Sequence, residues 1–349
     1  MNLSSMNLEK EQILIIGGTG TLGRALIKRL VLKNKLALFS RDEAKHWTIK
    51  NQLPDNATTE YFVGDIRDSS RLEEAMMLFQ PSIIIIAAAL KQVDTCELSP
   101  DESIQTNIMG VNNVLKLVQR WKHRLEKLRS VLMVSTDKAC APANVYGMCK
   151  AIGERLVTSM GLSLASPKFV GVRYGNVLES RGSIIPLFRY QAENLGGLTV
   201  THPEMTRFVM TLDQSIDLII NTLKGADTGE IWIPKLKSMR IGDLAQIFSE
   251  RYKKPVVTVG IRPGEKMHEE LISESESIRA REEEWFFKLR PPCAGEETGR
   301  TAFRYTSRDD VMSKLHLEKY LQSIGIFEKP LSQFSGLEIE EIKISEIKR

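Results

Sequence analysis

Residues 13–23, ILIIGGTGTLG, decide the fold of this chain. Four apolar residues without alternation are typical of a central parallel strand that is buried on both faces. Glycines follow at positions 17, 20 and 23, and a helical pattern of apolar residues continues over 25–31. The order strand, glycine-rich turn, helix predicts the first unit of a dinucleotide-binding fold.

The glycine spacing also predicts a phosphate site. Glycine permits a tight turn, close approach of a pyrophosphate to the backbone and close packing of helix on strand, and the helix N-terminus attracts the phosphate charge. A purely structural turn is the alternative. The cofactor-binding residues predicted here are Gly17, Thr19, Gly20, Thr21, Leu22 and Gly23.

Further apolar runs at 36–39, 61–63, 83–86 and 131–134 alternate with helical patterns over the first 165 residues. This alternation predicts an α/β fold, a Rossmann-type, right-handed, doubly wound parallel sheet with its ligand at the carboxyl edge. We expect one long helix over 99–129. We expect an NADP-binding domain at 11–175, and we expect the later segment at about 206–235 to return to it. A smaller α/β region at 176–335 is expected to bind mainly the substrate, and 336–349 form a tail.

The second strand ends at Ser40 and Arg41, followed by Asp42. A hydroxyl and an arginine suit the 2′-phosphate of NADP, whereas an acid at this point suits NAD. We therefore expect NADP, with NAD less favoured and a solvated Arg41 as the alternative. After the third strand come Asp65 and Ile66, where Asp65 either bonds the adenine ring or caps the helix that starts near position 69.

The fourth strand ends in Ala87, Ala88 and Ala89, whose small side chains let a cofactor lie close to the backbone. Core packing explains such a run nearly as well. Lys91 follows and is a candidate for a negatively charged substrate, with a solvated charge as the alternative. Asn107 is a supporting candidate only, because a side-chain amide inside a helix is usually exposed.

Two groups of acid/base residues follow the strand at 131–134. Tyr146 and Lys150 are four apart, so a helix places them on one face, where the ammonium ion favours loss of the phenol proton. Thr136, Asp137 and Lys138 fall at the carboxyl edge of the sheet and can face the same crevice. Beside a cofactor site, these five residues are the predicted catalytic group; an ordinary charged turn and a core Tyr/Lys pair are the alternatives.

Whole-chain properties exclude several classes. The 349 residues are 42% apolar and 26% charged, and the net charge of +4 is spread out, so nucleic acid is not indicated. Four cysteines stand in no paired spacing, which suggests neither a metal site nor disulfides and fits a reducing cytoplasm. No stretch reaches the roughly 18 apolar residues of a membrane span.

Several motifs together resemble the extended short-chain dehydrogenase/reductase superfamily, and more narrowly the soluble UDP-N-acetylglucosamine 4,6-dehydratases, including the C5-inverting type of polysaccharide biosynthesis. The resemblance runs from about 11 to about 275, and Thr-Asp-Lys rather than Thr-Asp-Glu separates this branch from the deoxyglucose-forming dehydratases. The motifs are AAALKQV (87–93), TNIMG (106–110), STDKACAPANVYGMCK (135–150), RYGNVLESRGSIIPLF (173–188), MTRF (205–208) and RPGEKMHEEL (262–271).

This resemblance implies a redox-neutral dehydration. Tyr146, its pKa lowered by Lys150 and the nicotinamide charge, would take the C4 hydroxyl proton while hydride passes to NADP⁺, and Thr136 would position the C4 oxygen. A neutral Lys138 would remove the C5 proton, which burial or a neighbouring cation could arrange. A protonated Asp137 would protonate the departing C6 hydroxyl, and hydride would return to C6.

The resemblance also implies sites in the second half. Tyr174 borders the nicotinamide, and the substrate-binding residues would be Lys91, Asn176, Arg181, Arg207, Arg262 and Glu265. A guanidinium suits a diphosphate, and a carboxylate can accept from ribose hydroxyls. Surface ion pairs are the alternative for the charged members.

Three questions stay open. Met148 and Cys149 stand on the catalytic helix where small or hydroxyl residues are more usual, so the outcome could be a 5,6-alkene or either C5 configuration. A UDP-sugar 4-epimerase or ketoreductase would need Tyr146 and Lys150 but neither Asp137 nor Lys138, and an NADP-binding regulator would need none of them. A homo-oligomer is expected from the resemblance only, and the amphipathic segment over 336–349 could pack on a neighbouring subunit.

Overall fold

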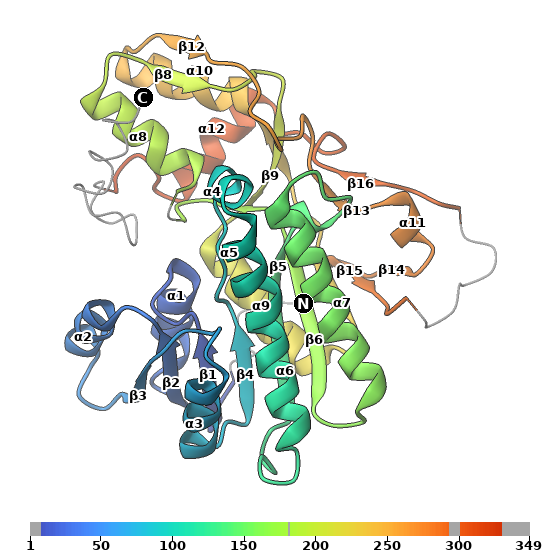
Figure 1. Ribbon diagram of the computed structural model, residues 1–349. Helices are drawn as coiled ribbons and strands as arrows, with labels where there is room; N and C mark the ends of the chain where they lie inside the picture. Colours follow the sequence, from blue (N-terminus) through green and yellow to red (C-terminus); the bar gives the residue numbers. More distant parts are fainter. Residues whose placement is uncertain (1–7, 181, 293–300, 330–349) are drawn as a thin grey trace.

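The structure is a computed structural model that describes residues 8–180, 182–292 and 301–329. Arg181, Cys293 and the tail at 336–349 lie outside the described residues. Most of the described chain is arranged around one large sheet, with a smaller region set over one end of it (Figure 1).

In the described residues the large sheet has nine strands in the order β14-β15-β10-β6-β5-β4-β1-β2-β3. The seven from β10 to β3 are parallel, while β15 and β14 continue the sheet antiparallel. The order β3-β2-β1-β4-β5-β6 is that of a doubly wound dinucleotide-binding sheet, as predicted. The strands are β1 Gln12–Ile16, β2 Lys35–Ser40, β3 Thr58–Val63, β4 Ile83–Ile86, β5 Ser130–Thr136, β6 Lys168–Tyr174, β10 Ile231–Pro234, β14 Ala280–Glu282 and β15 Phe286–Leu289.

The sheet is buried on both faces because its central strands contain unbroken apolar runs. In β1, Ile13 and Ile15 belong to one core cluster, whereas Leu14 and Ile16 belong to the other. Successive strand residues point to opposite faces, so an unbroken apolar run fills two cores at once.

Helices cover both faces. One core contains apolar residues of α1 (Thr21–Leu30) and α9 (Leu212–Gly225), and the other contains residues of α3 (Ser69–Phe79), α6 (Gly110–Arg120) and α7 (Val145–Ser163). The helix α2 (Glu43–Gln52) follows β2, and Asp42 caps it by accepting from the backbone N–H of Lys45. Of the described helices, none is both long and apolar enough to cross a membrane.

The helix expected over 99–129 was predicted too long. The chain instead forms α4 (Val93–Leu98), α5 (Pro100–Ile104), a π-helical turn at Gln105–Met109 and α6, which ends at Arg120. Leu125 and Leu128 prolonged the apolar pattern, but they fill the core from turns that precede β5.

The smaller region has its own core and lies at the top of Figure 1. It contains α8 (Ile184–Asn194), α10 (Ile241–Tyr252), α12 (Lys314–Ser323) and short strands. β8 (Leu198–Val200) pairs with β12 (Val256–Thr258), β9 (Thr206–Met210) pairs with β7 (Asn176–Val177) and β11 (Ser238–Arg240), and β13 (Glu270–Ile272) pairs with β16 (Tyr305–Thr306). Three later parts of the chain belong to the large sheet or pack on it, although they follow β7 and β8 in the sequence. They are α9, β10 and the hairpin β14–β15.

Candidate active site

The glycine-rich turn forms a cradle that side chains would fill. Gly17 has a φ of +91°, and a Cβ there would lie 2.6 Å from the backbone nitrogen of Ala88. A Cβ at Gly23 would lie 2.3 Å from the carbonyl oxygen of Gly18, so this glycine lets α1 pack on the turn. At Gly20, the residue before α1, the nearest atom to a Cβ is the Gly17 oxygen at 3.3 Å. These positions fit the close approach of a pyrophosphate.

A cavity of about 500 Å³ runs from this turn to the smaller region. It brings together most of the predicted site residues, from the cofactor turn, the end of β5, the start of α7 and the segments after β6. They are Gly17, Gly20, Thr21, Leu22, Gly23, Ala87, Ala89, Lys91, Thr136, Asp137, Lys138, Tyr146, Lys150, Tyr174, Asn176, Arg262 and Glu265.

Other predicted residues do not line this cavity. The Thr19 carbonyl accepts from Arg24 Nε at 3.2 Å, Ala88 packs behind Gly17, and Ile66 is buried against Gly110. Ser40, Arg41, Asp65 and Arg207 also lie outside the lining.

After the end of β2, the Asp42 carboxylate forms its contacts with α2, the helix that it caps. Its carboxylate caps α2 and lies 2.6 Å from Lys45 Nζ, and these contacts hold the pKa of Asp42 below its ordinary value. The Ser40 hydroxyl lies 2.6 Å from His46 Nε2, whereas the Arg41 side chain is 60% exposed.

Asp65 does not cap α3, so this alternative was wrong. The cap is Asp68, whose carboxylate accepts from the backbone N–H groups of Ser70 and Arg71. Asp65 instead accepts from the Arg67 guanidinium at 2.7 Å and lies 3.8 Å from Arg41.

Asp137 and Lys138 form a tight pair at the carboxyl end of β5. Lys138 Nζ donates to Asp137 Oδ1 at 3.1 Å, and the Thr136 hydroxyl donates to the same oxygen at 2.9 Å. The Asp137 side chain is 1% exposed, whereas that of Lys138 is 20% exposed and reaches the cavity. Both residues border the cavity, and the amine is the more exposed of the two.

The first turn of α7 is fixed against this pair. The Asn144 side chain accepts from Gly147 N and donates to the Gly264 carbonyl, at 2.8 Å each. A Cβ at Gly147 would lie 2.1 Å from the Lys138 oxygen, so only glycine lets the helix start here. Tyr146 and Lys150 consequently face the cavity from one side of α7.

The predicted effect of Lys150 on Tyr146 was wrong in this structure. Burial raises the pKa of Tyr146 to about 12, opposed by Lys138 and Thr136. Lys150 Nζ donates to the Val134 carbonyl at 2.5 Å, and burial lowers the pKa of Lys150 to about 8. The cation that acts on the phenol is Lys138.

In the resting site, neither burial nor a neighbouring cation makes Lys138 neutral. Burial lowers the pKa of Lys138, but the carboxylates of Asp137 and Glu269 outweigh it, and the pKa lies above its ordinary value. Arg207, a neighbouring cation, opposes this only in part. Burial raises the pKa of Asp137, which agrees with the predicted role as an acid.

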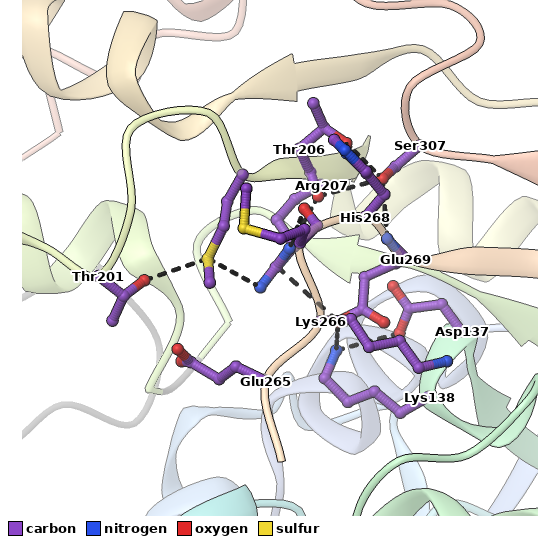
Figure 2. Close-up of polar contacts among 12 residues, drawn as sticks. Asp137, Lys138, Thr201, Thr206, Arg207, Glu265, Lys266, His268, Glu269 and Ser307 are labelled. Atoms are coloured by element: carbon purple, nitrogen blue, oxygen red, sulfur yellow. Dashed lines mark hydrogen bonds and ion pairs between the residues drawn. The ribbon is translucent and has the colours of Figure 1, made fainter. Parts of the chain in front are cut away.

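Glu269 is the residue that the sequence did not indicate. Its side chain is 3% exposed, and its Oε1 lies 3.4 Å from Lys138 Nζ and 3.8 Å from Arg207 Nε (Figure 2). It lies within the 262–271 motif, but only tertiary folding places it beside Lys138. Arg207 itself donates to the Thr206 carbonyl at 2.8 Å.

The outer part of the cavity carries the candidates for a nucleotide. Tyr174 and Asn176 line it after β6, and Glu265 accepts from the backbone N–H of Arg262 at 3.2 Å across the Pro263–Gly264 turn.

Asn107 is 1% exposed rather than solvated, contrary to expectation. It accepts from Leu90 N at 2.9 Å and donates to Leu90 O at 2.8 Å, which fixes the segment after β4.

Met148 and Cys149, the unusual residues on α7, do not line the cavity. Cys149 is buried, and burial raises the pKa of its thiol, whereas Met148 is exposed on the other side. Among the described residues, no group of three His, Cys, Asp or Glu is placed to hold a metal ion.

The chain is similar to a known protein family and to several named relatives. The family model described as polysaccharide biosynthesis protein matches residues 13–291. The UDP-glucose 4-epimerase of Rickettsia bellii is 38% identical over 77% of this chain and 79% of its own. The UDP-N-acetylglucosamine 4,6-dehydratase (inverting) of Campylobacter jejuni is 36% identical over 81% and 83%.

Among solved structures, Pen from Bacillus thuringiensis superposes with a TM-score of 0.83 at 33% identity. The match covers 93% of this chain and 100% of that one.

Proposed function

Because the chain belongs to the polysaccharide biosynthesis protein family of extended short-chain dehydrogenase/reductases, we propose that it dehydrates a UDP-N-acetylhexosamine, most simply UDP-N-acetylglucosamine, to the UDP-4-keto-6-deoxy sugar. The observation that carries this proposal is the Asp137–Lys138 pair in one cavity with Tyr146, Lys150 and the glycine cradle. Oxidation needs a tyrosine and a cofactor. An added acid and base are what elimination requires.

Each residue has a defined task. Tyr146 takes the C4 hydroxyl proton as a phenolate, which Lys138 and the positive charge of a bound nicotinamide would have to favour against burial, and the Lys150 ammonium donates to the Val134 carbonyl. A nicotinamide cofactor, when bound, supplies the redox chemistry by accepting hydride from C4 and returning it to C6. Lys138 removes the C5 proton once C4 is a ketone, and Asp137 donates a proton to the C6 hydroxyl as the C6–O bond breaks. The electrons of the C5–H bond form the C5–C6 double bond, and water leaves. Addition of hydride at C6 would then be completed by uptake of a proton at C5.

Formation of the reactive pair needs one proton transfer. Lys138 is held as an ammonium ion in the resting site, whereas the pKa of Asp137 is raised. Moving one proton across the 3.1 Å hydrogen bond from Lys138 to Asp137 gives a neutral base and a protonated acid together. Neither residue has to exchange a proton with solvent.

The cofactor that we propose is NADP. Asp42 is occupied by α2 and Lys45, which leaves Arg41 as the exposed charge beside the end of β2. A guanidinium at this place suits a 2′-phosphate.

For the substrate, we propose that Lys91, Arg262 and Arg207 contribute positive charge. Glu265 would accept hydrogen bonds from the nucleotide, and Asn176 would form hydrogen bonds with the nucleotide or the sugar. Arg181, which lies outside the described residues, stays a prediction. We therefore propose that the smaller region and the loops after β6 bind the substrate.

A 4-epimerase is the second candidate, because a relative that is 38% identical carries that name. Epimerisation uses Tyr146 and Lys150 but has no task for Asp137 and Lys138. The two reactions differ at C5, since only elimination breaks the C5–H bond.

An NMR time course of the protein with UDP-N-acetylglucosamine and NADP⁺ in deuterated water tests this proposal. We expect a C6 methyl group, a C4 ketone or its hydrate, and deuterium at C5. A product that keeps its C6 hydroxyl and its C5 proton would identify an epimerase instead. The same spectra report the C5 configuration.

A further inference from the structure

Glu269 is a buried carboxyl that faces the Asp137–Lys138 pair from a distant part of the chain. Its Oε1 lies 3.4 Å from Lys138 Nζ, and the same nitrogen lies 3.1 Å from Asp137 Oδ1 (Figure 2). The ammonium ion therefore lies between two carboxylates. One oxygen of each, Asp137 Oδ2 and Glu269 Oε2, is buried without a hydrogen-bond partner among the described residues.

The backbone around Glu269 is held by a network of small polar groups. Glu269 N donates to the Ser307 hydroxyl at 2.9 Å, and Ser307 N donates back to the Glu269 carbonyl at 2.8 Å. The Thr206 hydroxyl lies 2.6 Å from Ser307 Oγ and 2.8 Å from His268 Nδ1. Contacts from β9 and from the segment after β16 thus fix the backbone that carries this carboxyl (Figure 2).

The surrounding charges distinguish the two carboxylates. Burial raises the pKa of Glu269, but Lys138, Arg207 and Lys266 outweigh it and keep it below the ordinary value. Asp137 has Lys138 as its cation, and both burial and the Glu269 charge raise its pKa. Tyr146 is a further titratable group that faces the pair. Of the two carboxylates that touch the amine, Asp137 is the one disposed to accept a proton.

We propose that Glu269 is a positioning residue for the dehydration, which anchors the Lys138 amine and, by staying negatively charged, directs the proton of Lys138 to Asp137. The inference rests on the proposed function. In this transfer an N–H bond of Lys138 breaks, an O–H bond forms on Asp137, and the total charge of the site is unchanged. Glu269 acts through these two residues and does not touch the sugar.

The test is the pH profile of C5 deuterium exchange in the Glu269→Gln variant. The amide keeps the shape of the side chain but removes a negative charge, which lowers the pKa of both Lys138 and Asp137. The active pair shares one proton. The rising limb therefore follows loss of a second proton, governed by the pKa of Asp137, and the falling limb follows loss of the shared proton, governed by the pKa of Lys138, so both limbs should move to lower pH, by about one unit or more. A profile that keeps its position overturns the inference, whatever happens to the rate.

Two further variants give matched controls. Glu270→Gln makes the same chemical change at the next residue and should leave the profile in place. Glu269→Asp keeps the charge and should restore the position of the limbs if not the full rate.

Arg207→Gln tests the opposite sign. It removes a cation that lowers the pKa of Lys138, so the falling limb should move to higher pH. General loss of structure cannot shift the pH profiles of Glu269→Gln and Arg207→Gln in opposite directions. A limb that stays in place in Arg207→Gln also counts against the inference. If the wild-type protein shows no C5 exchange at all, the proposed function fails instead.

Discussion

Two lysines of the site show how neighbours decide the charge of a buried amine. Lys138 faces two carboxylates and keeps a raised pKa, although burial opposes the charge. Lys150 donates to the Val134 carbonyl, and burial lowers its pKa to about 8 despite Glu154. Identical side chains on neighbouring elements thus take different roles, because direct contact with a carboxylate outweighs desolvation at only one of them.

Replacing Lys138 tests its role as the base. In Lys138→Met the apolar stem stays and the amine is lost, so we expect C5 exchange to fall by about 100-fold or more. Binding of NADP⁺, followed by quenching of protein fluorescence, should stay within about twofold, because the amine lies beyond the glycine cradle. Exchange at the wild-type rate would remove Lys138 from the mechanism.

At the scale of elements, a break in a helix builds part of the site. The π-helical turn at Gln105–Met109 lies between α5 and α6, and it places the Asn107 amide against both backbone groups of Leu90. Leu90 immediately precedes Lys91, which lines the cavity. The interruption therefore shapes the segment that follows β4.

Asn107→Leu should destabilise the protein. The change keeps the side-chain volume but leaves the N–H and C=O of Leu90 without their partner, which costs about 1–3 kcal/mol. Urea unfolding followed by circular dichroism measures the loss. The half-buried Asn112 on α6 serves as the control, and its replacement by alanine should change stability by less than about 0.5 kcal/mol. Equal effects at the two positions would contradict the assigned role of Asn107.

At the scale of the whole molecule, Arg173 joins three parts of the chain. This side chain of β6 is buried and donates to Glu154 of α7, to Glu276 of α11 (Glu274–Ser277) and to the Leu271 carbonyl beside the smaller region. Its guanidinium lowers the pKa of Glu276 to about 2 against the effect of burial. A folded-state pKa below the unfolded value makes stability depend on pH.

The stabilisation from Glu276 is fully present above about pH 4.5 and is lost as the pH falls toward 2. Glu276→Gln should therefore cost about 2–3 kcal/mol at neutral pH and flatten the fall of stability over that window. Thermal unfolding between pH 2 and pH 7 measures both effects. Glu274→Gln on the same helix, where the carboxylate is 62% exposed, should leave the curve unchanged. A wild-type slope in Glu276→Gln would contradict this linkage.

Local patterns predicted the large sheet because its signals are short in range. The apolar runs at β1, β2, β4 and β5 correspond to observed strands, and the glycine at 23 meets a steric need that arises within the turn and the first helix. The four-residue spacing of Tyr146 and Lys150 is fixed by helix geometry alone. The same local patterns failed where the apolar period continued through turns, as at Leu125 and Leu128.

The sequence by itself determined a doubly wound sheet, its phosphate-binding turn and the acid/base residues at the end of β5, since each depends on residues within a few positions of one another. Only the tertiary structure decided the protonation of those residues. Coulomb energy depends on distances in space, and folding brings Glu269 and Arg207, which are distant from Lys138 in the sequence, close to its amine. The order of residues predicted which groups are present, and the folded packing set the charge that each one carries.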